Sequence, residues 1–219
     1  MLQNNDIVPV TLTKDEFDHC VVTALEISHS IVDRHDLNGR DHLDRFINLL
    51  QGECAEHAVR SYFNSHEIAA VSPDKLARRG PDKGIDLYLP APNRSKPLIC
   101  SVKSSTSYAF SPPALLDEMT LASTPKEVRD INIQVMFWLE LKKRPRQVVP
   151  SLRNAAVIGW FTPDQLTTFA PYSTQRREQS QIPLRQAHSM AELVKLLRSP
   201  GVEKKVSSLS DDEWLETIA

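Results

Sequence analysis

The sequence predicts an α+β protein in which a mixed central β-sheet is flanked by helices (class α/β in the broad sense). Two long amphipathic patterns in the first third of the chain predict helices, and five later runs of apolar or alternating residues predict strands. Helices and strands do not alternate strictly, which argues against a doubly wound sheet or a barrel. A chain of 219 residues is long enough for one domain with a sizeable core.

Both expected helices lie before residue 65. Thr13 and Glu16 form a capping-box pattern, and apolar residues follow at helical spacing, so we expect a helix over about 13 to 32. A second amphipathic helix is expected from Asp41 to about Asn64. Gly52 within it costs roughly 1 kcal/mol relative to alanine, which indicates that another part of the chain packs closely against its backbone.

The expected strands occupy 67–71, 85–89, 98–103, 131–141 and 155–161. A proline-containing turn separates the second from the third, which predicts a β-hairpin or meander. Residues 131–141 alternate apolar and polar side chains, which is typical of a long half-buried strand. Short helices are expected over 115–121, after Thr124, after Thr162 and after Ser189, whose Glu192 completes a capping box. The polar residues 172–188 are expected to form a connection.

Composition limits the function classes. Charged residues make up 25% and apolar residues 41%, as in ordinary globular proteins, and the net charge is −2, so nucleic-acid binding would need a local basic surface. Three cysteines without a pairing pattern argue against a disulfide framework or zinc ribbon and favour a reducing compartment. No stretch approaches the roughly 20 apolar residues that span a bilayer. We expect a soluble cytoplasmic protein with no membrane partner.

The residues most indicative of chemistry lie on the expected hairpin. Asp86 stands at the start of one strand and Lys103 near the end of the next, so a hairpin would bring a carboxylate and an ammonium to the same end of the sheet. A structural ion pair at a sheet edge is the alternative. A register shift of one residue would turn the two side chains to opposite faces and would leave a generic interaction domain.

These residues resemble the restriction-endonuclease-like, or PD-(D/E)XK, nuclease superfamily. The resemblance covers about residues 41–165, with an N-terminal helical region over 1–40 and a C-terminal helical extension over 166–219 packed on that core. It rests on four segments: Gly52-Glu53, Gly84-Ile85-Asp86-Leu87, Ser101-Val102-Lys103-Ser104-Ser105 and Val157 to Thr162.

The resemblance implies roles for four residues. Asp86 would bind Mg²⁺, for which Mn²⁺ can substitute, and Glu53 would reach the metal directly or through water. Lys103 would orient or activate the attacking water. Ser101 stands two positions before the lysine, where the family usually has Glu or Asp, so its hydroxyl and the Val102 carbonyl would replace the second acidic ligand.

Phosphodiester hydrolysis gives these residue types a physical reason. A hard cation held by oxygen ligands neutralises the scissile phosphate and lowers the pKa of bound water. A nearby ammonium stabilises the charge that develops in the transition state. Glu56 lies three residues from Glu53 on nearly the same helical face and is the alternative helix ligand.

Contacts with nucleic acid are expected from residues that flank the hairpin: Arg78, Arg79, Lys83, Ser104 and Ser105. Lys75 belongs to the same basic cluster. A second basic run contains Lys142, Lys143, Arg144, Arg146 and Arg153, and such a run is most often a solvated face.

The sequence therefore predicts a magnesium-dependent DNA endonuclease of the restriction-enzyme, mobile-element or phage kind. A homodimer is expected because two strands must be cut. One alternative is a nuclease fold that has lost catalysis and binds DNA or a protein, with Asp86 and Lys103 as a structural pair; Ser101 favours this alternative. The other is a ribonuclease on the same fold.

Overall fold

The computed structural model describes residues 1–30, 41–73, 85–91, 96–107, 112–141, 148–167, 170–172 and 175–198. Its centre is a curled, five-stranded mixed sheet with the order β1-β6-β5-β3-β2. The strands are β1 (Val8–Thr11), β2 (Leu87–Leu89), β3 (Leu98–Ser107), β5 (Ile131–Leu141) and β6 (Val148–Phe161). β3 and β5 are parallel, and the other neighbouring pairs are antiparallel.

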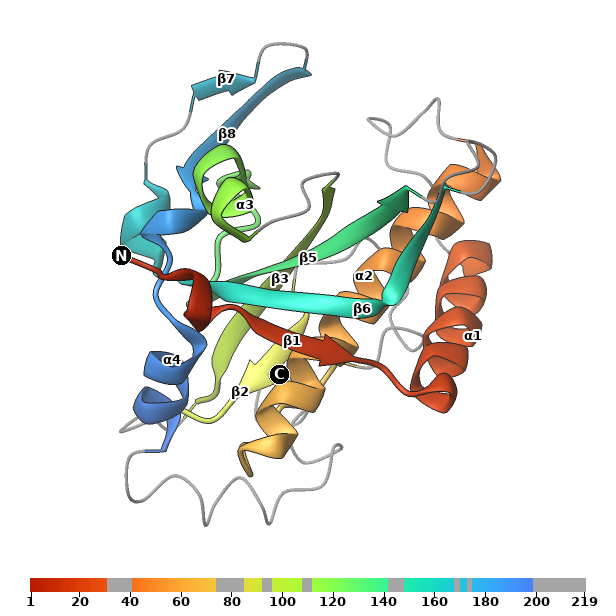
Figure 1. Ribbon diagram of the computed structural model, residues 1–219, viewed down its shortest axis with the longest axis horizontal. Helices are drawn as coiled ribbons and strands as arrows, with labels where there is room; N and C mark the ends of the chain where they lie inside the picture. Colours follow the sequence, from red (N-terminus) through yellow and green to blue (C-terminus); the bar gives the residue numbers. More distant parts are fainter. Residues whose placement is uncertain are drawn as a thin grey trace.

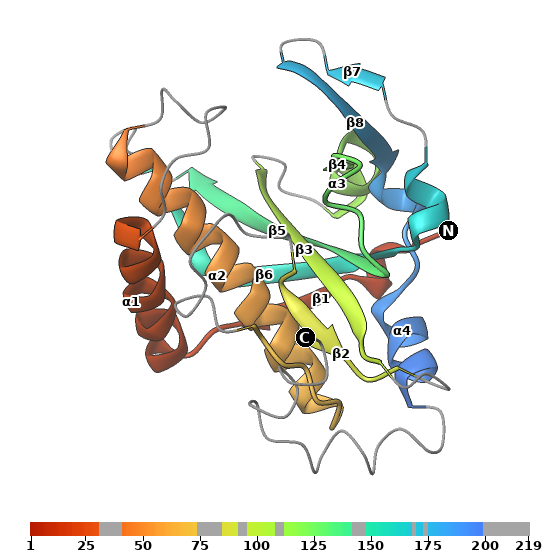
Figure 2. The ribbon, with the colours of Figure 1, turned by 180° about the vertical axis from the view of Figure 1, so that it is seen from behind.

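Helix α2 (His42–Ser65) packs against one face of this sheet, and α1 (Lys14–Ser30) packs alongside α2. Figure 1 shows α2 behind the strands, and Figure 2, seen from the other side, shows α2 in front of the sheet. Helix α4 (Met190–Leu197) joins the same apolar core through Met190 and Leu193. Alternation along β5 turns Ile133 and Val135 toward this core.

A second apolar core lies on the other face. It contains Met136 of β5 together with Leu115 and Leu116 of α3 (Pro112–Glu118). A three-stranded sheet with the order β4-β8-β7 completes this layer, at the upper left of Figure 1. Its strands are β4 (Thr120–Ser123), β7 (Ala170–Tyr172) and β8 (Gln175–Pro183).

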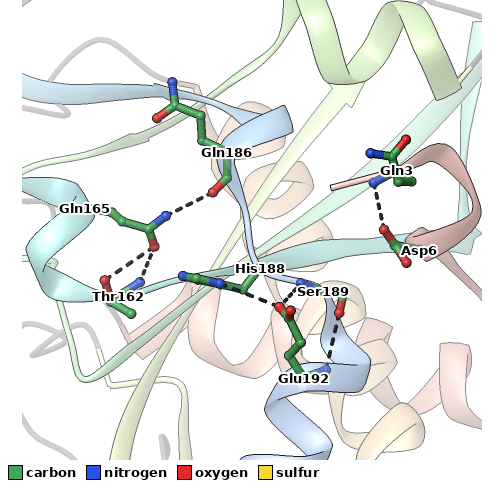
Figure 3. Close-up of polar contacts among 8 residues, drawn as sticks. All are labelled: Gln3, Asp6, Thr162, Gln165, Gln186, His188, Ser189 and Glu192. Carbon is green, nitrogen blue, oxygen red and sulfur yellow. Dashed lines mark hydrogen bonds and ion pairs between the residues drawn. The ribbon is translucent and has the colours of Figure 1, made fainter. Parts of the chain in front are cut away.

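The structure also has three short 3₁₀-helices: η1 (Asn4–Asp6) before β1, η2 (Pro163–Leu166) after β6 and η3 (Leu184–Gln186) after β8. Figure 3 shows the polar contacts there: Gln165 Nε2 donates to the Gln186 carbonyl at 2.9 Å. Ser189 and Glu192 form the expected capping box at the start of α4. His188 forms an antiparallel bridge with Trp160, which ties this segment to β6.

The two long helices, the strand over 131–141 and the antiparallel pairing of β2 with β3 agree with the sequence predictions. Three predictions were wrong. Residues 67–71 contain only an isolated bridge at Val71, Thr124 to Glu127 form a turn instead of a helix, and the polar stretch 172–188 contains β7 and β8. Strand formation depends on partners distant in sequence, which local polarity does not reveal.

The prediction of close packing at Gly52 was also wrong. A Cβ built at Gly52 would meet nothing within 4 Å, whereas one at Gly159 in β6 would lie 2.5 Å from the His188 carbonyl oxygen. The glycine that a close approach requires is therefore Gly159, at the bridge to His188. In the part of the chain that the structure describes, no helix combines the length and apolar character needed to cross a membrane.

Candidate functional site

The β2–β3 hairpin positions the predicted site. Leu87 pairs with Cys100 and Leu89 with Leu98, so Asp86 lies next to the middle of β3. The Asp86 amide donates to the Cys100 carbonyl at 3.0 Å. Asp86 Oδ2 accepts a hydrogen bond from the Val102 amide at 2.6 Å. The Asp86 carboxylate therefore occupies the edge of β3, just where β2 begins.

The Val102 backbone turns toward this edge. An extended residue directs its N–H and C=O toward the same neighbouring strand, so the Val102 carbonyl faces the Asp86 side together with its amide. The structure thus brings together two of the predicted metal ligands, the Asp86 carboxylate and the Val102 backbone.

Helix α2 contributes a carboxylate from the neighbouring core. Glu56 is only 8% exposed, and burial raises the pKa of the Cys100 thiol well above its ordinary value, with Asp86 and Glu56 adding to the rise. Both carboxylates thus act on the same buried thiol. The negative charge of Glu53 acts instead on Cys20 and Cys54, which lie toward α1. Glu56 is thus the α2 carboxylate whose charge, like that of Asp86, acts on Cys100.

Lys103 lies one residue beyond Val102, and alternation turns it to the opposite face of β3. Its Nζ lies 3.5 Å from Glu127 Oε2, and the two side chains are 25% and 33% exposed. Glu127 belongs to the turn before β5. Its Oε2 also accepts a hydrogen bond from the Thr124 amide at 3.1 Å. Lys103 therefore forms an ion pair with Glu127, a residue to which the sequence analysis assigns no role in the site.

Glu127 is held in its ionised form. Burial raises the pKa of its carboxyl group. The Lys103 ammonium and the hydrogen bonds from Thr124 together lower the pKa by more than burial raises it, so the pKa of Glu127 is below its ordinary value. The sequence signal is the Thr124-Pro125-Lys126-Glu127 pattern, which predicts a helix start. The same reciprocal contacts close a turn, because Glu127 N also donates to the Thr124 carbonyl at 2.9 Å.

Ser101 shares the face of Lys103. Ser101 and Lys103 stand beside Asn132 and Gln134 of β5 in the parallel register, and Asn132 and Gln134 are buried. We call these four side chains the polar strip. Among the described residues, the buried Ser101 Oγ has no hydrogen-bond partner. Its hydroxyl lies on the face of the sheet opposite to the Val102 side chain.

The two hydroxyl residues after Lys103 have partners from different elements. Ser104 Oγ accepts a hydrogen bond from Gln51 Nε2 of α2 at 3.2 Å. Ser105 Oγ accepts one from Gln134 Nε2 at 3.5 Å. The two hydroxyls therefore lie on opposite faces of β3. A nucleic-acid strand bound to one face of the sheet could contact only one of them.

The predicted basic contacts fall mainly outside the described residues: Lys75, Arg78, Arg79, Lys83, Lys142, Lys143, Arg144 and Arg146. Arg153 is described, and its Nε donates to the Leu12 carbonyl at 3.1 Å. Arg153 therefore joins β6 to the segment between β1 and α1.

The described residues contain no group of three His, Cys, Asp or Glu side chains placed to hold a metal ion. Mg²⁺ does not require such a group, because it keeps several waters and binds through one or two carboxylates and substrate phosphates. Asp86, Glu56 and the Val102 carbonyl are hard oxygen donors of the kind that Mg²⁺ prefers. The chemistry of these donors is thus of the type that magnesium accepts.

Comparison of the chain with family models, with curated proteins and with solved structures found no match.

Proposed function

We propose that this protein is a metal-dependent DNA endonuclease with a restriction-endonuclease-like core over residues 41–165. The observation that carries the proposal is the register of Leu87 with Cys100. That register places the Asp86 carboxylate on the Val102 amide, one residue before Lys103. The Asp86 carboxylate, just before β2, is thereby bound to β3 one residue before Lys103, and the resemblance to the nuclease superfamily implies a carboxylate and a lysine near each other.

Magnesium, or manganese in its place, would be held at the edge of β3 by the Asp86 carboxylate and the Val102 carbonyl. A carboxylate of α2 would reach this edge from the face of the sheet opposite to Lys103 and Ser101. Glu56, whose charge acts with that of Asp86 on Cys100, is one candidate on α2, and Glu53 is the one that the resemblance implies. The metal would supply charge neutralisation at the scissile phosphate and a bound water of lowered pKa. Asp86 would keep its orientation through the hydrogen bond from Val102.

Lys103 would stabilise the negative charge that develops on the phosphate. In the structure its ammonium pairs with Glu127. The lysine stem is long and flexible, so an incoming phosphate can compete with a carboxylate for the same ammonium. Glu127 would then hold Lys103 charged and in place until the substrate binds. The Ser101 hydroxyl, on the same face as Lys103, would donate to the same phosphate.

The expected DNA surface joins this site to the basic residues Arg78, Arg79 and Lys83 that precede Asp86 in the sequence. Cleavage of both strands of a duplex would be served by a homodimer, which presents the same site to each strand. We place the activity in the cytoplasm, in keeping with three free cysteines.

The second candidate is a nuclease fold that binds DNA or a protein without cutting. The contact of Lys103 with Glu127 favours it, because a lysine already paired with a carboxylate serves as a structural ion pair. Serine at position 101 also removes the acidic ligand that the family usually supplies there.

The test is incubation of the purified chain with circular and linear duplex DNA and with single-stranded RNA, in Mg²⁺, Mn²⁺ or EDTA. Metal-dependent cutting of the duplex, with EDTA abolishing it, supports the endonuclease. Cutting of RNA alone moves the function to a ribonuclease. Binding of DNA without cutting in either metal supports the second candidate and contradicts the first.

A further inference from the structure

Strand β3 is longer than the strand that covers its outer edge, the edge away from β5. Strand β2 pairs with residues 98–100 of β3, and Asp86 accepts the Val102 amide just beyond that pairing. Residues 103–107 continue past this point and pair with β5 along the other edge. The stretch 102–106 is half-buried. The second half of β3 therefore runs beyond β2, next to the proposed site.

Alternate residues of β3 direct their backbone N–H and C=O groups to opposite edges. The Ile99 amide donates to a side chain beside β5, and the Val102 amide donates to Asp86 beside β2. Even-numbered residues therefore face outward, and these include Ser104 and Thr106. In the part of the chain that the structure describes, the outward backbone groups of these two residues have no hydrogen-bond partner. We call these groups the open edge.

The sequence of the open edge suits pairing with another strand. Proteins usually protect such an edge with proline, a bulge or charged side chains. Residues 104–107 read Ser-Ser-Thr-Ser and contain neither proline nor charge. Lys103, the charged residue of β3, is paired with Glu127 on one face of the sheet. Among the described residues, nothing therefore blocks the approach of a second extended chain along this edge.

We propose that the open edge pairs with the open edge of a second copy of this chain, antiparallel, with Ser105 on the two-fold axis. Ser104 of each copy then lies opposite Thr106 of the other, and each pair exchanges two N–H···O=C hydrogen bonds. A register shifted toward the start of β3 would need the Val102 amide, which Asp86 already binds. A shift the other way would set Ser104 opposite a residue beyond the end of β3.

The ends and the charges of the two strands fit this register. β3 ends at Ser107, which would lie opposite Lys103 of the other copy, so the paired strand ends before it reaches Asp86. The two Lys103 side chains do not face each other, because each lies opposite a serine. Serine and threonine side chains that lie opposite each other on antiparallel strands also stabilise the pairing.

The pairing would join the two five-stranded sheets into one and set α2 of both copies on the same face. Six residues of strand, about 20 Å, would separate the two Asp86 positions. The inference supplies the interface for the homodimer in the proposed function. Only the use of both sites on one duplex rests on that function, because the pairing itself involves no cleavage.

Sedimentation of the reduced full-length chain over about 1–200 μM measures assembly. Wild type is expected to reach twice the monomer mass. Thr106→Pro removes an outward N–H that has no partner among the described residues, so the variant should fold and should dimerise at least about tenfold more weakly. Thr106→Val keeps this N–H and is the matched control, which should dimerise as wild type does. Far-ultraviolet circular dichroism shows whether each variant is folded.

Ser105→Cys tests the register and does not depend on the proline variant. Residues opposite each other in a non-hydrogen-bonded antiparallel pair have Cα atoms about 4.5 Å apart, within the range of a disulfide. Mild oxidation should therefore link Ser105→Cys into a covalent dimer. Thr106→Cys should link at least about tenfold more slowly, because its two copies would lie about 8 Å apart. Wild type is the control for the three native cysteines, which are buried.

A chain that stays monomeric at about 200 μM overturns the proposal and leaves the edge to a different partner. A dimer that folded Thr106→Pro leaves intact also overturns it, as does linkage of Thr106→Cys as fast as Ser105→Cys. DNA cleavage is measured separately on the same samples. A dimer with the expected properties that cuts no DNA supports this inference and contradicts the endonuclease, whereas cutting by a monomer does the reverse.

Discussion

Lys103 Nζ lies 3.5 Å from Glu127 Oε2, which joins the middle of β3 to the turn that precedes β5. The same carboxylate oxygen accepts the Thr124 amide. The pair is partly shielded from water, so its charges matter more than those of an exposed salt bridge. It is also the contact on which the nuclease and binding proposals differ, because Lys103 serves either a substrate phosphate or Glu127.

Replacement of Lys103 by methionine should destabilise the protein in a pH-dependent way. The lowered pKa of Glu127 stabilises the folded state above about pH 4.5, and this stability is lost as the pH falls through the folded-state pKa. Without the ammonium, burial raises that pKa. We expect Lys103→Met to cost about 1–2 kcal/mol at pH 7 and less at pH 3.5, as measured by urea unfolding.

Lys126→Met is the matched control, because Lys126 is an exposed lysine one residue from Glu127. It should change the free energy of unfolding little at either pH. An equal loss for Lys103→Met at pH 7 and pH 3.5 would show that the ammonium does not stabilise ionised Glu127. The same data show whether loss of cleavage by a Lys103 variant reflects lost chemistry or unfolding.

Glu56→Gln and Glu53→Gln should separate the two candidate helix ligands. Glutamine keeps the size of either side chain and removes its charge. We expect Glu56→Gln to weaken Mn²⁺ binding at least about tenfold and Glu53→Gln to change it little, because Glu56 and Asp86 act on the same thiol. Isothermal titration with Mn²⁺ measures both. Greater weakening by Glu53→Gln would return the ligand role to Glu53.

The hairpin and its chemistry were predictable from the sequence because they depend on local pattern. Ile85 and Leu87 flank Asp86, and a proline-containing turn follows, so the pairing of β2 with β3 could be inferred without knowing the rest of the fold. Glu127 could not be found in this way. Its carboxylate meets Lys103 only because β5 is parallel to β3, and that neighbour is set by tertiary packing.

The second sheet was missed for a related reason. Residues 175–183 are mostly polar, with three glutamines and two arginines, yet they form β8, which is the middle strand between β4 and β7. A strand that faces solvent on one side does not need an apolar sequence, so composition predicted a connection. The capping box at Ser189 and Glu192 was found because it depends only on residues three apart.

Gly159 and Gly52 should respond in opposite ways to alanine. The new Cβ at Gly159 would lie 2.5 Å from the His188 carbonyl oxygen, and that carbonyl accepts the Trp160 amide and cannot easily move. We expect Gly159→Ala to cost about 1–3 kcal/mol. Gly52→Ala should stabilise α2 by roughly 0.5–1 kcal/mol, because nothing opposes the methyl group. Thermal and urea unfolding measure the stability of both variants. Equal changes in the free energy of unfolding would contradict a close contact between Gly159 and the His188 carbonyl.

Glu16 should account for part of the acid sensitivity of the helix pair. The hydrogen bond from the Thr13 amide lowers its pKa to about 2, so Glu16 stabilises the folded state above about pH 4.5 and loses this effect as the pH falls toward 2. Wild-type protein should therefore lose more stability than Glu16→Gln between pH 5 and pH 2. Asp15→Asn, which removes a neighbouring exposed carboxylate, is the control. If the free energy of unfolding of wild type and of Glu16→Gln changed identically between pH 5 and pH 2, Glu16 would not contribute to the acid sensitivity.

Two aspartates accept amides of the same strand, and this makes the central claim testable with a matched pair. Asp86 Oδ2 accepts the Val102 amide and Asp130 Oδ2 the Ile99 amide, at 2.6 and 3.0 Å. The decisive measurement is cleavage of circular duplex DNA in Mg²⁺ by wild type, Asp86→Asn and Asp130→Asn, each shown to be folded. We predict cutting by wild type and Asp130→Asn and a loss of at least about a hundredfold in Asp86→Asn. Equal rates for the two variants, or no cutting by the wild type, would contradict a metal-dependent nuclease site at Asp86.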